Sequence, residues 1–279
     1  MTIWETILLG VVQGLTEFLP VSSSGHLVLV QVLLDVEEAD VFFDVVLHLG
    51  TLGSIGVVYR RDLLRMASAA VRLVGNPSRL RHPNRTLRDD EELRMMACVV
   101  VASVPTAIIG FLFRGQLESA FHRPALVGAM LLVTGTLLLL SGAILESRRR
   151  RSADVHRQLE WWQAPLVGLA QGIAILPGIS RSGATISTAL LFGVEPAAAA
   201  RFSFLLSVPA ILGAALFKLV EAAEIVLEPA ILLTGFLVSF TVGWAALAFL
   251  LSMLRRGRFG VFAWYCFALG GITILLALS

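Results

Sequence analysis

Pro20-Val-Ser-Ser-Ser-Gly25 interrupts the first long apolar stretch of the chain, residues 2–34, and Pro177-Gly-Ile-Ser-Arg-Ser-Gly183 interrupts a later one, residues 161–193. Proline beside Ser and Gly ends a helix, because proline lacks a backbone N–H and Ser competes for backbone hydrogen bonds. At membrane depth, non-helical backbone is tolerated only where protein or water surrounds it. Each stretch is therefore predicted to be a re-entrant hairpin: a helix, a polar turn and a second helix.

The rest of the chain has the composition of a membrane protein. Of its 279 residues 57% are hydrophobic and only 15% are charged, whereas soluble domains are about 25% charged. Apolar runs of about 18 residues or more indicate spanning helices. The start of the chain lacks a basic region, so we expect no cleavable signal peptide. The predicted spans are 41–59, 93–113, 124–146, 199–217, 229–252 and 259–278.

Charged residues in the connecting segments predict the topology. Arginines crowd segments 60–92, 147–160 and 255–258, which the positive-inside rule assigns to the cytoplasm. Segment 218–228 carries three glutamates against one lysine, which fits the outside. Alternation then brings the first hairpin in from the outside and the second from the cytoplasm, with both termini outside.

This topology makes the two halves similar but oppositely oriented. We predict an all-α polytopic membrane protein, one membrane domain over 1–279, whose halves 1–146 and 161–279 each hold one hairpin and three spans. Residues 147–160 would be a basic cytoplasmic linker. The motif Gly10-Val-Val-Gln-Gly14 matches Gly168-Leu-Ala-Gln-Gly172. Inverted repeats with broken helices build anion and ion sites near the membrane midplane.

The first hairpin carries ionisable and hydroxyl groups. Gln13 and Glu17 lie four residues apart and share a helix face. An ionisable group in an apolar run is a functional candidate, although Glu17 could also be paired only for structure. The turn adds Ser22, Ser23, Ser24, Gly25 and His26. Hydroxyls and free N–H groups at a helix start bind anions, while simple helix capping is the alternative for the serines.

The second hairpin contributes the one cation of its stretch, Arg181. Arginine binds phosphate in a bidentate manner, and glycine lets the backbone approach phosphate oxygens. The alternative is a structural ion pair with Glu17, and the two interpretations are compatible. The flanking residues are Ser180, Ser182, Gly183 and Thr185.

Three other features are open to more than one interpretation. Asp44 and His48 share a helix face and could line the pocket or cap it. Arg201 could be an interfacial anchor. Cys98 and Cys266 are expected to be packing residues, because two thiols this far apart in apolar segments form neither a disulfide framework nor a Cys-based metal site.

Together these groups suit phosphoryl transfer, which needs charge neutralisation on the phosphate, a nucleophile and a proton donor. Arg181, the turn N–H groups and a metal held by Glu17 could supply the first. Ser23, His26 or a water could supply the nucleophile. A site buried among lipid-facing spans implies a substrate with an apolar tail.

The two motifs, Gln13-Gly-Leu-Thr-Glu-Phe-Leu-Pro-Val-Ser-Ser-Ser-Gly-His26 and Pro177-Gly-Ile-Ser-Arg-Ser-Gly-Ala-Thr-Ile186, closely resemble the signatures of the bacterial undecaprenyl-diphosphatase (bacitracin-resistance) family. The resemblance covers essentially the whole chain. It implies hydrolysis of undecaprenyl diphosphate to undecaprenyl phosphate at the outer face of the bacterial cytoplasmic membrane, which recycles the lipid carrier of cell-wall synthesis. It also implies a divalent cation, Mg²⁺ or Ca²⁺.

The resemblance also implies roles for individual residues. The acidic pair of the family falls at Gln13 and Glu17, the Ser/His pair at Ser23 and His26, and the phosphate-binding group at Ser180, Arg181, Ser182 and Thr185. Many members carry Glu where this chain has Gln13, and an amide brings no charge to a metal. His26 as a phosphohistidine and His26 as the base for Ser23 both stay open.

Three rival functions use similar residues. A lipid-phosphate transporter or flippase would need Arg181 and the turns but no nucleophile. An intramembrane serine protease fits less well, because Arg181 suits phosphate better than peptide. A phosphatase of the soluble acid-phosphatase type would need a His after the Ser-Arg segment, and none follows His156. We expect membrane lipids and a polyprenyl diphosphate as partners, and no nucleic acid; a homodimer stays open.

Overall fold

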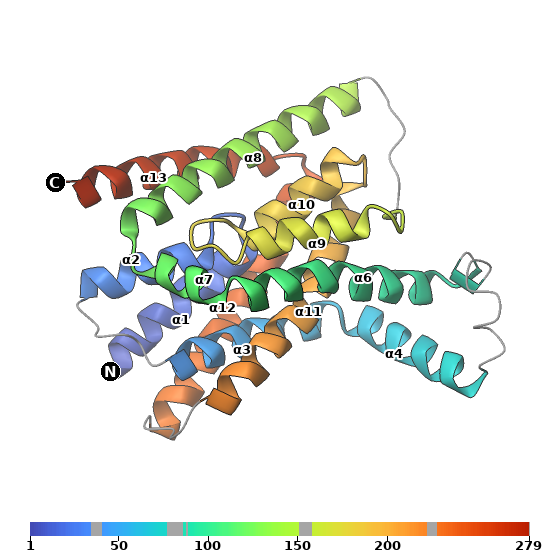
Figure 1. Ribbon diagram of the computed structural model, residues 1–279, viewed down its shortest axis with the longest axis horizontal. Helices are drawn as coiled ribbons and strands as arrows, with labels where there is room; N and C mark the ends of the chain where they lie inside the picture. The colour runs from blue at the N-terminus through green and yellow to red at the C-terminus, as the bar shows by residue number, and fades with distance from the viewer. Residues whose placement is uncertain (35–40, 77–85, 88, 151–157, 222–227, 279) are drawn as a thin grey trace.

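Long helices run side by side through the molecule (Figure 1). The computed structural model describes residues 1–34, 41–76, 86–87, 89–150, 158–221 and 228–278. Within these residues the fold is helical and contains no strand. The principal helices are α1 (Ile3–Phe18), α2 (Ser23–Leu34), α3 (Val41–Val58), α4 (Arg60–Gly75), α6 (Glu91–Leu112), α7 (Arg114–Phe121), α8 (Pro124–Arg150), α9 (Ala164–Ile173), α10 (Arg181–Leu191), α11 (Pro196–Glu221), α12 (Pro229–Arg255) and α13 (Phe262–Leu278), the last preceded by the short 3₁₀ helix η2 (Phe259–Val261).

The predicted spans are confirmed as helices. Within the described residues, α6, α8, α11, α12 and η2 with α13 are each long and apolar enough to cross a membrane. The 18-residue α3 is the sixth candidate, and it bends by 81° into α4 after Val58. The chain is therefore a multi-pass membrane protein.

Both predicted hairpins are present. In each, two short helices lie beside each other and are joined by a polar turn, α1 with α2 and α9 with α10. Their lengths of 16, 12, 10 and 11 residues correspond to roughly 15–24 Å, less than the ~30 Å of a hydrocarbon core. None of the four helices can span a membrane alone, as expected for re-entrant elements.

The inverted repeat is visible in how the halves exchange partners. Helix α1 packs against α12, and its counterpart α9 packs against α6. The repeated glycines make these contacts: a Cβ at Gly14 would lie 2.8 Å from Val242 Cβ, and one at Gly168 would lie 1.9 Å from the Ala102 carbonyl oxygen. Each hairpin is thus packed into the opposite half, which brings the two turns together.

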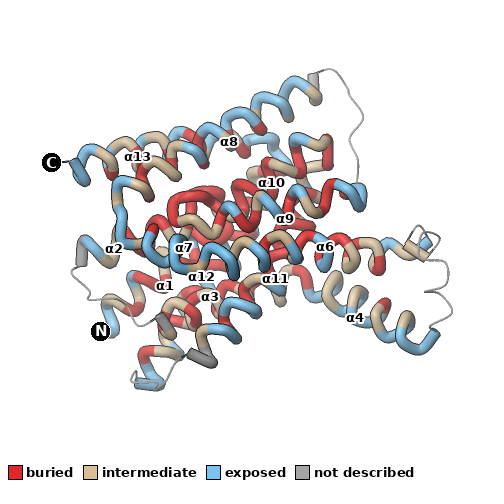
Figure 2. Tube along the Cα trace, viewed as in Figure 1, coloured by how far each residue is buried: buried red, intermediate tan, exposed pale blue. Residues whose placement is uncertain are grey.

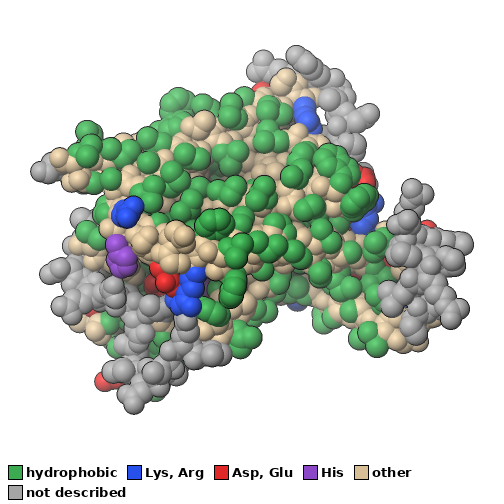
Figure 3. All heavy atoms as spheres, in the orientation of Figure 1, with side chains coloured by type: hydrophobic (Ala, Val, Ile, Leu, Met, Phe, Trp, Pro, Cys, Tyr) green, Lys and Arg blue, Asp and Glu red, His purple; other side chains and the backbone are tan. Residues whose placement is uncertain are grey.

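Burial and surface chemistry agree with a membrane environment. Residues around the hairpin turns are mostly buried (Figure 2), and large apolar side chains such as Phe111 and Leu275 are more than 70% exposed. On the face shown in Figure 3, hydrophobic side chains cover the middle and charged ones gather toward the two ends. Both chain termini lie at one end, and α4 lies at the other (Figure 1).

Two segments predicted as loops contain helices. Helix α4 occupies the first part of segment 60–92, and α7 occupies most of segment 114–123. The sequence did not reveal these helices, because both are short and charged and neither contains an apolar run long enough to span a membrane. One side of α4 packs on the bundle, with Ala69 buried and Leu63 and Met66 partly buried against the core, while its other side is exposed. Several of the arginines counted in the topology argument, in 77–85, 88 and 151–157, lie outside the described residues.

Candidate active site at the meeting of the two hairpin turns

The two hairpin turns are joined by Ser22. Its Oγ accepts hydrogen bonds from Gly178 N at 3.0 Å and from Gly25 N at 3.3 Å. Ser22 adopts φ +70° and Gly178 φ +95°, the left-handed region that side chains rarely adopt. A Cβ at Gly178 would lie 2.3 Å from the Val127 carbonyl oxygen, so glycine is required there by both conformation and space. The predicted meeting of the hairpins is therefore a direct contact.

Thr134 of α8 supports the second turn. Its hydroxyl donates to the Gly178 carbonyl oxygen at 2.8 Å and accepts from Ser180 N at 3.1 Å. Ser180 then caps α10, since its Oγ accepts from Gly183 N at 3.0 Å. Arg181 is the first residue of that helix, and a helix N-terminus favours anions.

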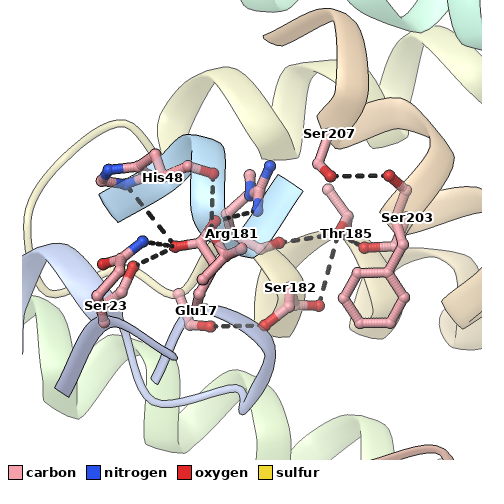
Figure 4. A network of polar contacts seen from close by, with 12 residues as sticks. Glu17, Ser23, His48, Arg181, Ser182, Thr185, Ser203 and Ser207 are labelled. Carbon is pink, nitrogen blue, oxygen red and sulfur yellow. Dashed lines mark hydrogen bonds and ion pairs between the residues drawn. The ribbon is translucent and has the colours of Figure 1, made fainter. Parts of the chain in front are cut away.

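Glu17, at the end of α1, is the centre of the polar cluster (Figure 4). Its Oε1 pairs with the guanidinium of Arg181. Its Oε2 accepts from Ser23 Oγ at 2.6 Å and from Gln13 Nε2 at 3.1 Å. The Glu17 side chain is only 4% exposed. A buried carboxylate needs such partners, because its desolvation is otherwise prohibitive.

Two buried polar atoms beside Glu17 have no hydrogen-bond partner among the described residues. They are Gln13 Oε1, an acceptor, and Arg181 NH1, a donor. Leaving such groups unpaired costs about 1–3 kcal/mol each, and more for a charged group. One free acceptor and one free guanidinium donor in the same cluster are what a phosphate and a cation or water would satisfy.

His48 joins this cluster from α3. Its Nδ1 lies 2.7 Å from the Asp44 carbonyl oxygen, an atom that only accepts, so Nδ1 carries the proton. Its Nε2 lies 3.8 Å from Glu17 Oε2, and the side chain is 33% exposed. From its sequence, His48 could line the pocket or cap it, and no chemical role is predicted for it. The structure places His48 beside Glu17 (Figure 4), and its side chain is more exposed than that of Glu17.

Hydroxyl groups extend the site from Arg181 toward α11. Thr185 Oγ1 lies 2.5 Å from Ser203 Oγ, and Ser182 Oγ lies 3.2 Å from Ser180 Oγ. These side chains are buried. Hydrogen bonds between these hydroxyls satisfy the predicted phosphate-binding residues in surroundings that are otherwise apolar. Ser203 is an additional member of the site that was not predicted from the sequence.

His26 faces a different neighbour. Its Nδ1 lies 2.7 Å from the Ser22 carbonyl oxygen and therefore donates to it, and its Nε2 lies 2.7 Å from Tyr265 Oη of α13. The two rings are stacked, with an angle of 6° between their planes. In this conformation the Ser23 hydroxyl donates to Glu17 rather than to His26. Tyr265 gave no signal in the sequence, because it lies in a uniformly apolar span.

Most of the predicted site residues are thus brought together. Gln13, Glu17, Ser23 and Arg181 form the central contacts. Ser22 and Ser24 bond to each other at 3.3 Å in the first turn. A Cβ at Gly25 would lie 3.2 Å from Gly178 Cα, so the turns approach closely here. The chemical roles assigned to these residues stay predictions.

The residues present can be compared with what a divalent cation needs. No group of three or more His, Cys, Asp or Glu side chains among the described residues could hold a metal. Mg²⁺, however, is often bound by one or two carboxylates together with substrate phosphates and water. Glu17 supplies one carboxylate, and Gln13 Oε1 is an acceptor free for a ligand. The donor set fits a cation that arrives with a diphosphate, and not one held by protein alone.

Known proteins similar to this chain share almost its full length. The family model described as bacitracin resistance protein BacA matches residues 6–272. The undecaprenyl-diphosphatase of Desulfosudis oleivorans is 47% identical, with 98% of each chain covered. The undecaprenyl-diphosphatases of Rubrobacter xylanophilus and Methanosphaera stadtmanae are 43% and 37% identical, with 98% and 99% of each chain covered.

Proposed function

Because this chain belongs to the bacitracin resistance protein BacA family, we propose that its composite site hydrolyses undecaprenyl diphosphate to undecaprenyl phosphate and inorganic phosphate. The observation that carries the proposal is the contact between Glu17 of one hairpin and Arg181 of the other, with Ser23 held at 2.6 Å from the carboxylate. A transporter would have no need for a hydroxyl bound to a buried carboxylate.

Arg181 would bind the terminal phosphate. Its NH1 is buried without a partner among the described residues and can donate to a phosphate oxygen at once. Its pairing with Glu17 would then be exchanged for pairing with the substrate, since a guanidinium binds phosphate and carboxylate with the same geometry. Neutralising the phosphate oxygens is the main contribution that phosphoryl transfer requires from a protein.

Release from Arg181 would leave Glu17 as the acceptor for the Ser23 proton. Ser23 Oγ attacks the terminal phosphorus, its proton passes to Glu17 Oε2, and the bond to the bridging oxygen breaks to release undecaprenyl phosphate. The undecaprenyl phosphate takes that proton from Glu17 as it leaves. Water then gives a proton to Glu17 and attacks the phosphoserine, the bond between Ser23 Oγ and phosphorus breaks, and Glu17 returns the proton to Ser23 Oγ as inorganic phosphate is released. The predicted base for Ser23 is His26, but its Nε2 faces Tyr265, and the hydrogen bond from Ser23 to Glu17 supports Glu17 in that role instead.

Gln13 and Glu17 would hold Mg²⁺ or Ca²⁺ together with the diphosphate. When bound, the cation supplies additional neutralisation of the diphosphate charge. Its binding residues are in the first hairpin, so each turn would contribute one positive group to the substrate: the cation from the first and Arg181 from the second.

The site would face the outer side of the bacterial cytoplasmic membrane. The arginine-rich connections indicate that the α4 end is cytoplasmic. The partly exposed His48 lies on α3, whose first residues belong to the opposite end, which supports access from the outside. The apolar exterior suits a substrate whose prenyl chain stays in the bilayer.

The test is phosphate release from undecaprenyl diphosphate by the purified protein, with and without EDTA, beside Glu17→Ala, Arg181→Ala and His26→Ala. We expect release that depends on the cation and falls by about 100-fold or more in the first two variants. The His26→Ala variant should fall less, because His26 does not contact the central cluster. Absence of release from the unaltered protein, with tight lipid binding retained, would favour transport instead.

A further inference from the structure

An open groove lies where the end of α12 meets the end of α3, and none of its lining residues belongs to the hairpin turns. Its volume is about 370 Å³, and it is lined by Val58, Ala248, Leu251, Ser252, Arg255 and Arg256. Val58, Ala248 and Leu251 give it apolar walls. Arg255 and Arg256 are exposed at its rim, and none of the six residues is acidic.

The position of this groove relative to the bilayer follows from the helices around it. Arg255 is the last residue of α12, and Leu250 and Leu254 just before it are buried. Val58 ends α3, after which the chain bends by 81° into α4. The apolar parts of α3 and α12 therefore end beside each other at this groove. The groove lies where the hydrocarbon region of the bilayer meets its polar surface.

Helix α4 gives a second indication of that level. Leu64, Val71 and Val74 recur at helical spacing and are 69%, 71% and 82% exposed. Arg61, Arg65 and Arg72 are exposed as well. An exposed apolar stripe beside several arginines, just after the end of a span, is typical of a segment at the level of the lipid head groups. The groove beside its first residues is therefore at head-group depth.

We propose that this groove binds one anionic phospholipid, with an acyl chain along Val58, Ala248 and Leu251 and the phosphate between Arg255 and Arg256. Basic pockets between transmembrane helices on the cytoplasmic side suit anionic head groups. Two adjacent guanidinium groups fit a phosphate oxygen pair. A zwitterionic lipid would bring an ammonium group to a rim that holds no carboxylate, and so would bind less tightly.

The experiment measures lipid retention by the purified full-length protein with native mass spectrometry. Phosphatidylglycerol and phosphatidylcholine with the same acyl chains are added at equal concentration. We expect selective retention of phosphatidylglycerol, and at least tenfold weaker binding by Arg255→Gln/Arg256→Gln. Arg258→Gln is the matched control, because it removes an exposed arginine next to the groove that does not line it, and it should bind like the unaltered protein.

A second variant separates the groove from general surface charge. Ala248 is exposed in the groove, so Ala248→Phe fills the space without disturbing the core and should weaken retention with every arginine in place. Equal retention of both lipids, an equal loss in Arg258→Gln, or no loss in Ala248→Phe would overturn the proposal. Displacement by undecaprenyl phosphate in preference to phosphatidylglycerol would overturn it too, by assigning the groove to the enzyme's product.

The groove lies outside the hairpin site, so its failure and that of the proposed function are distinguishable. Phosphate release by Arg255→Gln/Arg256→Gln in detergent without phospholipid should equal that of the unaltered protein. A loss of release there, with normal phosphatidylglycerol binding, would assign these arginines to the reaction instead and overturn the lipid site.

Discussion

The first and second hairpins share one architecture but differ in chemistry. Each consists of a helix, a polar turn containing a residue with positive φ, and a second helix, and each is packed into the opposite half. The first carries the carboxylate of Glu17 and the second the guanidinium of Arg181. The proposed phosphate site therefore takes its opposite charges from the two hairpins and requires their contact.

The matched glutamines show the same difference at one position. Gln13 Nε2 donates to Glu17 at 3.1 Å, whereas Gln171 Nε2 donates to Thr106 Oγ1 at 3.2 Å. Both residues are buried, and the Oε1 atom of each has no partner among the described residues. The same Gly-x-x-Gln-Gly pattern therefore supports a charged cluster in one half and a neutral helix contact in the other.

The largest effect is expected from Ser23→Ala compared with Ser182→Ala in the other turn. Loss of the proposed nucleophile should lower kcat by about 10⁴-fold or more. Among the residues that the structure describes, Ser182 Oγ makes long contacts, to Ser180 Oγ at 3.2 Å and to the Leu19 carbonyl oxygen at 3.4 Å, so its removal should cost about tenfold at most. Single-turnover phosphate release measures both. Equal losses in the two variants would remove the chemical distinction between the turns.

A double substitution separates the contribution of the Glu17–Arg181 ion pair to stability from its contribution to activity. Glu17→Gln or Arg181→Gln alone leaves one buried charge unpaired, which should cost about 3–5 kcal/mol of stability and about 100-fold or more of activity. The Glu17→Gln/Arg181→Gln protein removes both charges, so it should recover much of the stability but none of the activity. Thermal unfolding in detergent and phosphate release measure the two quantities.

A different outcome would change the interpretation of this contact. A double variant that unfolds as easily as either single variant would show that the charges do not act mainly on each other. A double variant with restored activity would show that the pair is structural only, and that the phosphate is neutralised elsewhere.

The fold could be predicted because its signals are local. Apolar runs, Pro beside Ser and Gly, and clustered arginines gave the spans, hairpins and topology. Helices α4 and α7 were missed because the apolar face of a short surface helix is not distinguishable in composition from a polar loop. Residues 57–60 at the bend include no Pro or Gly, and the contacts that accompany it, such as packing of α4 on α6 and the ion pair of Asp62 with Arg201 at 2.6 Å, are long-range.

The site was only partly predictable. The sequence shows which side chains can bind phosphate or transfer a proton, but it does not show which of them face each other in the fold. Glu17 and Arg181 stood out as charges in apolar stretches. His48 lies four residues after Asp44 on a helix whose direction across the membrane could be predicted, but the sequence did not show which face of that helix points to the site. The partner of His26 is Tyr265, 239 residues away, and no spacing rule connects residues so far apart.

A smaller effect should distinguish the two glutamines. Gln13→Glu places a second carboxylate beside Glu17, where a divalent cation can use both, so the Mg²⁺ or Ca²⁺ concentration for half-maximal release should fall by about tenfold. Gln171 donates to the neutral Thr106 hydroxyl, so Gln171→Glu should leave the cation requirement unchanged while lowering thermal stability, because the new buried charge has no opposite charge in that contact. Cation titrations at fixed substrate, with unfolding measured in parallel, test the difference.

Unchanged cation dependence in Gln13→Glu would place the cation away from the first turn. The remaining role of the Gln13 amide would then be to orient Glu17 through its N–H bond. A lower cation concentration for half-maximal release in Gln171→Glu would also contradict the comparison, because it would show that either half can bind the cation.

The smallest effect concerns an ion pair outside the membrane, which sharpens the contrast with the buried one. The hydrogen bond from Arg114 Nε at 2.9 Å lowers the pKa of the Glu118 carboxyl below its ordinary 4.5, and the charges of Arg114 and Lys218 lower it further. A lowered folded-state pKa contributes stability that is present above pH 4.5 and is lost as the pH falls through the lowered value. Because Glu118 is half exposed, the contribution should stay below about 1 kcal/mol.

Glu118→Gln should therefore unfold slightly more easily than the unaltered protein at pH 7 and equally easily in acid, and 1 M salt should reduce the difference at pH 7. A loss at pH 7 as large as that of Glu17→Gln would show that burial is not what gives the hairpin pair its strength.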